Sequence, residues 1–411
     1  MSVDAALNRV RNNLNENWLD WDVTESELKD STQALKELSP SERNEAIGKL
    51  SDDELKHWAA ETKGLNSPLN ADDRRDLLNV FAKDLDASQL ARVSKAFGAT
   101  DVAASVASHT PADRKAEYIQ ALQGDADGAA KIEAGFGVST ATAGNDNARA
   151  IAQVLGSLKD SPAQFASAAQ GLEQAGKLDD VMMAASGARL TTIAASVPIG
   201  SATTTISFDD KQLQDILAGA AALPPSDLAT RTSLFKAGAQ PLASMQQSAA
   251  RGLTNDPNGE AAQRTGTALG KVLTREQAEA AGIVDKQTMP PGVSMDQNIK
   301  ESHAHSVLDI WSWFMPQVQN KGPWDYKQQG AQYQDFGNFN YGLTAAATGI
   351  PEQVALRGAG WAQQQAGTGQ GGWGGPLDPN GGPYGDDPAD QALIKKGYEY
   401  YNSGLWRVWS D

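Results

Sequence analysis

The chain has 411 residues and no cysteine, and its 51 acidic and 35 basic side chains give a formal net charge of −16. This length is enough for two or three domains with buried cores. The absence of cysteine excludes disulfides, thiol catalysis and thiolate metal sites. The acidic balance disfavours nucleic acid as a partner, because nucleic-acid-binding proteins usually present a basic face.

Residues 1–10 lack the apolar run of a secretory signal peptide. No stretch of the chain approaches the roughly eighteen apolar residues that a membrane-spanning helix needs. We therefore expect no transmembrane segment. If the protein leaves its cell, we expect a route that does not read a Sec-type signal.

Residues 28–195 show apolar side chains at helical spacing and explicit helix starts. The starts fit the capping box, in which a short side chain accepts a backbone N–H and a later Glu or Gln reaches back. They are Thr24-x-x-Glu27, Ser39-x-x-Glu42, Ser51-x-x-Glu54, Asp86-x-x-Gln89 and Ser161-x-x-Gln164. This pattern predicts stacked helical hairpins, and we assign residues 1–200 to an all-α, repeat-like region.

Residues 201–292 are predicted to form a helical and linker region. Within it, residues 201–208 fit one short strand or an extended linker, and Thr274-x-x-Gln277 caps a further helix. The sequence Met289-Pro-Pro-Gly292 is typical of a semi-rigid spacer, so we place the main domain boundary there.

The composition changes after this spacer, because 17 of the 27 aromatic residues follow residue 300. We predict a helix over 295–315 and then an aromatic and glycine-rich segment in which 335–342 forms a hairpin. A small-residue helix over 344–365, a Gly/Pro loop and a final helix over 387–401 complete residues 293–411. Ionisable groups among aromatics and glycines favour a pocket in this part of the chain.

Several spaced motifs in residues 293–405 resemble the bacterial polymorphic toxin type 44 domain. They are Asn320-Lys-Gly-Pro-Trp-Asp-Tyr-Lys327, Asp335-Phe-Gly-Asn-Phe-Asn-Tyr-Gly342, Gly349-Ile-Pro351, Tyr384-Gly-Asp-Asp-Pro-x-Asp-Gln391 and Gly397-Tyr-x-Tyr400. The resemblance implies a C-terminal toxin that a secretion system delivers into competitor bacteria, together with a cognate immunity protein. It also implies that the N-terminal helices serve delivery, through a secretion-system component or adaptor. It does not define the reaction.

One hypothesis is a hydrolase of peptidoglycan glycan strands, acting without a cofactor in the periplasm or cell wall of target bacteria. Such sites need one protonated carboxylic acid and a second acidic or water-holding group. We predict Glu301 as the general acid on a helix, with Asp325 and Asp335 as candidates for the second group, in a small, α-rich, lysozyme-like α+β domain. The predicted substrate contacts are Trp324, Tyr326, Lys327, Asn338, Asn340, Tyr341 and Gln363.

Three alternatives stay open. A nuclease could use His303, His305, Lys327 and Arg357, although the two histidines point to different faces of a helix and the domain is acidic. A non-catalytic glycan-binding module could use the same asparagine and tyrosine side chains. A loose calcium loop could involve Asp378, Asn380, Asp386 and Asp387, but the segment from Asp386 fits a helix N-cap equally well.

Overall fold

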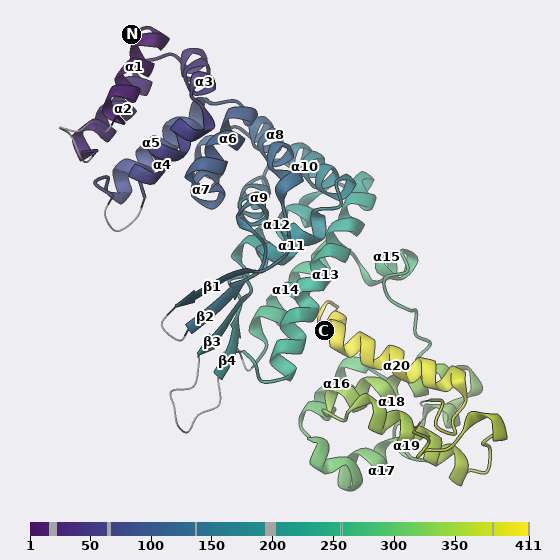
Figure 1. The fold of residues 1–411 in the computed structure, drawn as a ribbon. Helices are drawn as coiled ribbons and strands as arrows, with labels where there is room; N and C mark the ends of the chain where they lie inside the picture. Colours follow the sequence, from purple (N-terminus) through teal and green to yellow (C-terminus); the bar gives the residue numbers. More distant parts are fainter. Residues whose placement is uncertain are drawn as a thin grey trace, which may run out of the picture. The chain divides into compact units, whose positions relative to one another are not determined.

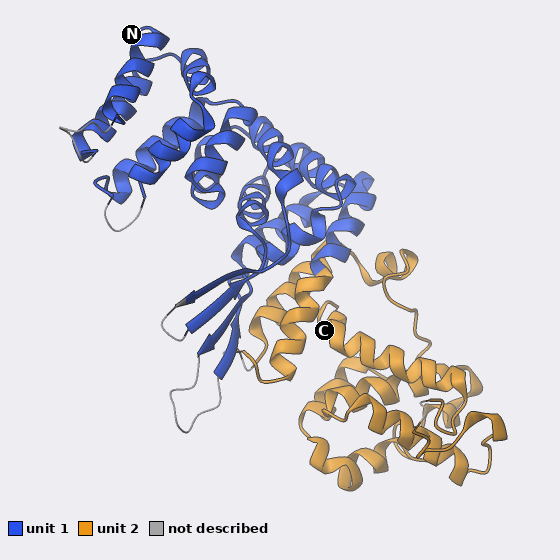
Figure 2. Cartoon of the chain, viewed as in Figure 1, with its two compact units in different colours: residues 1–238 blue, residues 239–411 orange. Residues whose placement is uncertain are grey.

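The computed structural model describes the chain except for residues 16–22, 64–66, 136–137, 194–202, 255, 257, 380–381 and 410–411. The described chain forms two compact units, residues 1–238 and 239–411 (Figure 2). Both units are mainly helical, as the sequence predicts. None of the described helices is long and apolar enough to cross a membrane.

Unit 1 is built from short helices that pack against the next helix but one in the chain (Figure 1). Thus α4 contacts α6, α6 contacts α8, and α5 contacts α7. This arrangement is the predicted stack of helical hairpins. The helices are α1 (Val3–Asn13), α2 (Glu25–Lys36), α3 (Pro40–Lys49), α4 (Asp52–Glu61), α5 (Ala71–Asp84), α6 (Ala87–Phe97), α7 (Ala99–His109), α8 (Ala112–Leu122), α9 (Asp146–Gly156), α10 (Pro162–Gln174), α11 (Leu178–Ala185) and α12 (Lys211–Ala222).

Most of the predicted helix starts are capped as expected. Full capping boxes begin α2, α3 and α4 at Thr24, Ser39 and Ser51, and Asp86 accepts the backbone N–H of Gln89 at the start of α6. The exception is Ser161 before α10, whose side chain makes no capping hydrogen bond. These local contacts fix where the short helices begin.

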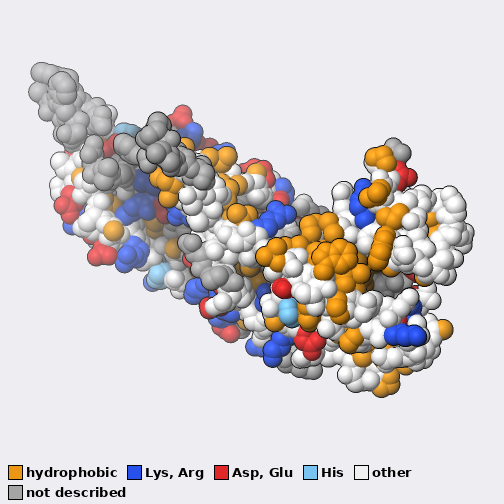
Figure 3. All heavy atoms as spheres, turned by 90° about the horizontal axis from the view of Figure 1, so that it is seen from below, with side chains coloured by type: hydrophobic (Ala, Val, Ile, Leu, Met, Phe, Trp, Pro, Cys, Tyr) orange, Lys and Arg blue, Asp and Glu red, His pale blue; other side chains and the backbone are white. Residues whose placement is uncertain are grey.

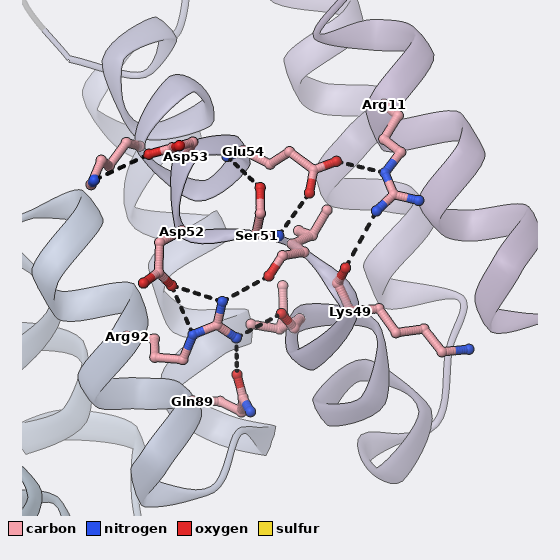
Figure 4. A network of polar contacts seen from close by, with 11 residues as sticks. Arg11, Lys49, Ser51, Asp52, Asp53, Glu54, Gln89 and Arg92 are labelled. Carbon is pink, nitrogen blue, oxygen red and sulfur yellow. Dashed lines mark hydrogen bonds and ion pairs between the residues drawn. The ribbon is translucent and has the colours of Figure 1, made fainter.

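Polar contacts join separate helices of the stack (Figure 4). Arg11 of α1 donates to the Glu54 carboxylate of α4 at 2.6 Å and to the Lys49 carbonyl at 3.3 Å. Arg92 of α6 donates to Asp52 of α4 at 2.8 Å. Helix α4 is therefore held from both sides by arginines that contact its first turn.

Unit 1 also contains a four-stranded sheet, which the helical pattern did not predict. Its strands β1 (Lys131–Gly135), β2 (Val138–Thr142), β3 (Arg189–Ile193) and β4 (Thr203–Ser207) lie in that order, each antiparallel to the next. Only β4 matches an expectation, the short strand proposed for residues 201–208. The other three strands lie inside the range that we expected to be helical throughout. They are short and partly exposed, so they give only a weak alternating pattern.

One aromatic core of unit 2 is formed by residues between Met295 and Tyr401. The helices of unit 2 are the end of α13 (Leu228–Ala250), α14 (Glu260–Val272), α15 (Arg275–Ala280), α16 (Met295–His303), α17 (Met315–Val318), α18 (Gln334–Ala347), α19 (Glu352–Gln365) and α20 (Pro388–Ser403). The rings of Trp324, Tyr326, Phe336 and Phe339 are all buried in this core. The final predicted helix matches α20 closely. The expected helix over 295–315 ends instead at His303 and is followed by a 3-10 turn and a π-helix over Ile310–Phe314.

The hairpin predicted for residues 335–342 is wrong, because these residues form the first half of α18. The expected helix over 344–365 is correspondingly two helices, separated by Gly349 and Pro351 between α18 and α19. Glycine in the 335–342 segment serves helix packing rather than a turn. At Gly342 a Cβ atom would lie 2.0 Å from the Ile394 carbonyl oxygen of α20, so only glycine allows the two helices to approach this closely.

Candidate active site

Three acidic residues lie together in the sequence at the start of α20. Asp386 precedes the helix, Asp387 is its N-cap and Asp390 lies in its first turn. Asp387 accepts the backbone N–H of Ala389 at 2.8 Å, which confirms the capping interpretation of this segment. Asp390 is hydrogen-bonded to Gln334 of α18, and Asp386 accepts a hydrogen bond from Gln391 of α20. We call the set Lys327, Gln334, Asn338, Tyr341, Asp386 and Asp390 the carboxyl cluster.

Asp386 is buried, with only 3% of its surface exposed. The Nε2 atom of Gln391 donates to its Oδ2 at 2.8 Å and also to the Leu356 carbonyl at 3.1 Å. Burial raises the pKa of the Asp386 carboxyl, and the Asp387 carboxylate raises it further, against lowering by the Gln391 bond and by Lys327. Asp386 therefore keeps its proton to a higher pH than an ordinary aspartic acid does.

Asp390 is half-buried beside it. Burial again raises the pKa of this carboxyl, and the nearby carboxylates of Asp386 and Asp387 add to the effect. A hydrogen bond to Gln334 of α18 and the charge of Lys327 lower its pKa in part. Asp386 and Asp390 thus interact with each other and share the same cation, so a proton held by one of them favours ionisation of the other.

Tyr341 closes the cluster from the side of α18. Its hydroxyl donates to the Ala355 carbonyl at 2.9 Å. Burial raises the pKa of Tyr341, and the charge of Asp386 raises it further. The phenol is therefore neutral and serves as a fixed dipole beside the carboxyl groups.

Asn338 lies on the same face of α18 as Gln334 and Tyr341, because residues three and four apart are neighbours on a helix. Its Nδ2 atom is buried and has no hydrogen-bond partner among the described residues. A buried amide donor without a partner is costly and is characteristic of a site that receives a ligand or water. It could donate a hydrogen bond to a substrate oxygen placed beside the carboxyl cluster.

The three predicted catalytic carboxyl groups have different surroundings. Glu301 is exposed on α16, accepts a hydrogen bond from Gln297 at 2.8 Å and lies close enough to Tyr326 to raise the pKa of that phenol slightly. Asp325 is buried, and its Oδ2 accepts the Lys321 backbone N–H at 2.7 Å, so it closes its own turn. Asp335 is exposed in the first turn of α18. Among the described residues, no hydrogen bond or ion pair joins these three groups to one another.

The predicted substrate contacts divide by burial. Trp324, Tyr326 and Asn340 lie in the core, where Asn298 donates to the Tyr326 hydroxyl and to Asn340 Oδ1, both at 2.8 Å. This network holds α16 against α18. By contrast Lys327 is exposed, and Asn338, Tyr341 and Gln363 are partly exposed. Lys327, Asn338 and Tyr341 belong to the carboxyl cluster, whereas Gln363 is on α19.

Exposed aromatic rings occur at positions that we did not predict. Trp311, in the π-helix, is 76% exposed, and Trp361 of α19 is 47% exposed. Figure 3 shows that hydrophobic side chains gather into patches on the face of the molecule seen from below. Exposed apolar groups of this size mark binding surfaces. The spacing of residues in the sequence did not predict that these two tryptophans are exposed and that Trp324 is buried.

The side chains proposed for a nuclease have separate partners. His303 shares a 2.9 Å hydrogen bond with the Tyr401 hydroxyl, whereas the His305 ring stacks on Trp313 at 3.9 Å. Arg357 donates to the Pro376 carbonyl at 2.6 Å and lies over the Tyr384 ring. These contacts give each group a structural role of its own.

The calcium interpretation involves the loop before α20, which the structure describes only in part. Within the residues that the structure describes, no group of three or more His, Asp or Glu side chains is arranged to hold a metal ion. Asp378 and Asp386 belong to different parts of the loop, Asp387 caps α20, and Asn380 lies outside the described residues.

The comparison with protein families decides the nature of this domain. Residues 320–403 match the family model of bacterial toxin 44. Residues 320–403 are therefore similar to a bacterial toxin 44 domain, as the resemblance implied. No curated protein matches the chain. The toxin 44 segment contains every member of the carboxyl cluster, whereas Glu301 lies before it.

Sequence reasoning named Asp386 but gave it no catalytic role. The available signal was the Tyr384 to Gln391 motif, which we used for the resemblance and explained by helix capping or a loose calcium loop. The motif contains three aspartates, and capping needs only one of them. The remaining two are the pair whose pKa values are raised.

Proposed function

We propose that the protein is a secreted antibacterial effector whose toxin domain hydrolyses the glycan strands of peptidoglycan. The observation that supports this proposal best is the pair Asp386 and Asp390. Glycoside hydrolysis requires a protonated carboxylic acid near a second carboxyl group. Both groups have raised pKa values and lie within the toxin 44 segment.

In this proposal Asp386 is the general acid that protonates the glycosidic oxygen, because it is the more buried of the two. Asp390, ionised, stabilises positive charge on the sugar or activates a water molecule. The free Nδ2 of Asn338 donates to a sugar hydroxyl, and Lys327 keeps Asp390 ionised. Trp311 and Trp361 offer flat faces on which sugar rings can pack.

The charge of the cluster argues against a polyanionic substrate. Asp386 and Asp390 lie at the start of α20, Asp387 caps the same helix, and the charge of Lys327 lowers the pKa of Asp386 and of Asp390 only in part. Phosphate groups of a nucleic acid would be repelled at such a site. An uncharged sugar backbone is not, so a glycan fits the electrostatics better than DNA or RNA does.

The sequence-based arrangement is part of the same proposal and predicts different essential residues. There Glu301 is the acid, and Asp325 or Asp335 is the second group. The two arrangements share the substrate and differ in which substitutions abolish activity, so one set of variants distinguishes them.

The toxin domain implies a protective partner in the producing cell, and we propose a cognate immunity protein for that role. We further propose delivery without a Sec signal, with the helices of unit 1 contacting a secretion-system component or adaptor. The site of action in this proposal is the periplasm or cell wall of the target bacterium.

The test is digestion of purified sacculi by the full-length protein, followed by analysis of the released fragments. We expect new reducing ends. Asp386→Asn and Asp390→Asn should each lower their release at least 100-fold, the scale of general acid catalysis. Glu301→Gln and Asp335→Asn serve as matched controls and should stay within about threefold of the unmodified protein.

The reverse pattern, in which Glu301→Gln alone is inactive, would assign the acid to α16. Shortened stem peptides on intact glycan would replace the glycosidase proposal with an amidase or peptidase. Expression in a bacterial host with and without an export signal adds a second readout. A wall hydrolase harms the host only when exported, a nuclease only when retained, and a glycan-binding module in neither case.

A further inference from the structure

The last residues of unit 2 leave the toxin domain and pack on a helical hairpin that precedes it. Helix α20 ends at Gly404, which adopts a left-handed conformation with φ 73° and lies against Leu242 of α13. A 3-10 turn over Leu405–Arg407 follows. We call residues 404–409 the tail, and residues 239–273, which contain the end of α13 and all of α14, the hairpin.

Two glycines of α14 form the surface that receives the tail. A Cβ atom at Gly266 would lie 2.9 Å from the Arg407 carbonyl oxygen, and one at Gly270 would lie 2.3 Å from that of Val408. The tail backbone therefore passes directly over α14, at a distance that side chains would prevent. Val408 is 5% exposed at this contact.

Polar contacts fix the register of the tail on the hairpin. Arg407 donates to Gln246 Oε1 at 2.8 Å and to Gln263 Oε1 at 3.2 Å. The Trp409 indole donates to the Leu273 carbonyl at 2.9 Å. These bonds reach both helices of the hairpin, so the contact is specific and not only apolar.

The other side of the tail is anchored in the toxin domain. The Trp406 ring stacks parallel to Tyr401 of α20, with ring centroids 5.9 Å apart, and the His303 ring of α16 packs against it edge-on. Arg407 lies 4.3 Å above the Trp406 ring. The tail thus links the core of the toxin domain to the hairpin through consecutive residues.

The last part of the chain segment that leads from the hairpin to the toxin domain is irregular and largely exposed. Residues 281–294 join α15 to α16 without regular structure, and Asp285, Lys286, Pro291 and Gly292 are exposed. Asp285 forms a 2.8 Å ion pair with Lys396, and both partners are at least half exposed. Such a pair contributes little to binding.

We propose that the tail is an intramolecular docking element that holds the toxin domain on the hairpin even when the connecting segment is cut. The hairpin is then a carrier to which the toxin domain stays bound without a covalent link. This proposal concerns association alone and does not depend on the reaction that the toxin domain catalyses.

The test uses the full-length chain with a specific protease site inserted between Lys286 and Gly292. After complete cleavage, we expect the two fragments to elute together in size-exclusion chromatography at micromolar concentration. Separate elution of the fragments from the chain with an unmodified tail would overturn the proposal.

Variants then assign the contact to the tail. Gly270→Leu should release the toxin fragment after cleavage, whereas Gly371→Leu, at a glycine with no atom within 4 Å of its Cβ position, should not. Arg407→Met, which loses two side-chain hydrogen bonds, should weaken association roughly tenfold and covers the case in which Gly270→Leu does not fold. Continued co-elution after deletion of residues 404–409 would show that the tail is not the docking element.

Discussion

Gly342 of α18 and Ile394 of α20 are in backbone contact, since a Cβ atom on the glycine would meet the Ile394 carbonyl oxygen at 2.0 Å. A second close contact lies on α20, where a Cβ atom at Gly397 would be 2.2 Å from the Phe339 carbonyl oxygen of α18. The residues of the carboxyl cluster are on these two helices or directly before α20, except Lys327, which is on the 3-10 helix Tyr326–Gln329. The spacing of the helices therefore determines the spacing of the site.

Gly342→Ala should destabilise unit 2 by about 1–3 kcal/mol, because the added methyl group forces the two helices apart. Alanine has the higher helix propensity, so a loss of stability can only come from this packing contact. Amide hydrogen exchange in α18 measures the effect. Gly371→Ala is the control, because its Cβ position is open. Equal protection in both variants would contradict the close contact.

Asn298→Ala should cost about 2–4 kcal/mol of unit 2 stability, because it removes two bonds and leaves the buried Tyr326 hydroxyl and Asn340 carbonyl without a donor. Thermal unfolding followed by near-ultraviolet circular dichroism reports it through the aromatic core. Asn402→Ala changes an exposed asparagine of α20 and should have no measurable effect. A loss below about 0.5 kcal/mol for Asn298→Ala would mean that the network contributes little.

Asp386→Asn should lower activity while maintaining or raising stability at neutral pH. The folded-state pKa of Asp386 lies above its ordinary value of 3.8, so the folded protein binds this proton more tightly than the unfolded chain does. Stability from this group is present at low pH and is lost as the pH rises through the folded-state pKa. An asparagine avoids that loss. A midpoint of thermal unfolding at pH 7 below that of the unmodified protein would argue against a strained, buried carboxyl.

The Arg11 to Glu54 contact should make unit 1 sensitive to acid. The Arg11 bond, with help from Ser51, lowers the pKa of Glu54 from 4.5 to about 2. Its contribution is therefore present above pH 4.5 and is lost as the pH falls toward 2. Arg11→Met should cost up to about 1 kcal/mol at pH 7, because both partners are partly exposed, and almost nothing at pH 2.

Amide hydrogen exchange in α4 at the two pH values measures this difference. Lys56→Met is the matched control on the same helix, since the Lys56 to Asp53 pair is far more exposed. The same loss for Arg11→Met at both pH values would show that the arginine acts through packing and not through charge.

The sequence predicts helix starts well because capping is local. Thr24, Ser39, Ser51 and Thr274 each cap as expected, since the acceptor and donor lie three residues apart in the chain. The segment over 335–342 shows the opposite case. Its two glycines indicate a turn when read alone, and the contact of Gly342 with α20 explains why that glycine occurs within a helix.

The candidate site shows the same limit. The resemblance located the toxin domain, but burial separates Asp386 from Glu301, and burial depends on residues distant in the chain. The side-chain amide of Gln391 donates to the Asp386 carboxyl and to the Leu356 carbonyl, and Asp386 is buried. Glu301 on α16 is exposed to solvent. The spacing of residues in the sequence does not predict this difference in burial between Asp386 and Glu301.

The fit of the tail against Gly266 and Gly270 bears on the construction of chimeras. A graft that began at the first residue of the toxin 44 segment would transplant Arg407 and Trp409 into a new host protein while leaving their receptor helices behind. In such a hybrid, the Arg407 guanidinium and the Trp409 indole would lack the hydrogen-bond acceptors that the hairpin supplies. A cassette that starts near Ala239 contains both the tail and the hairpin on which the tail packs.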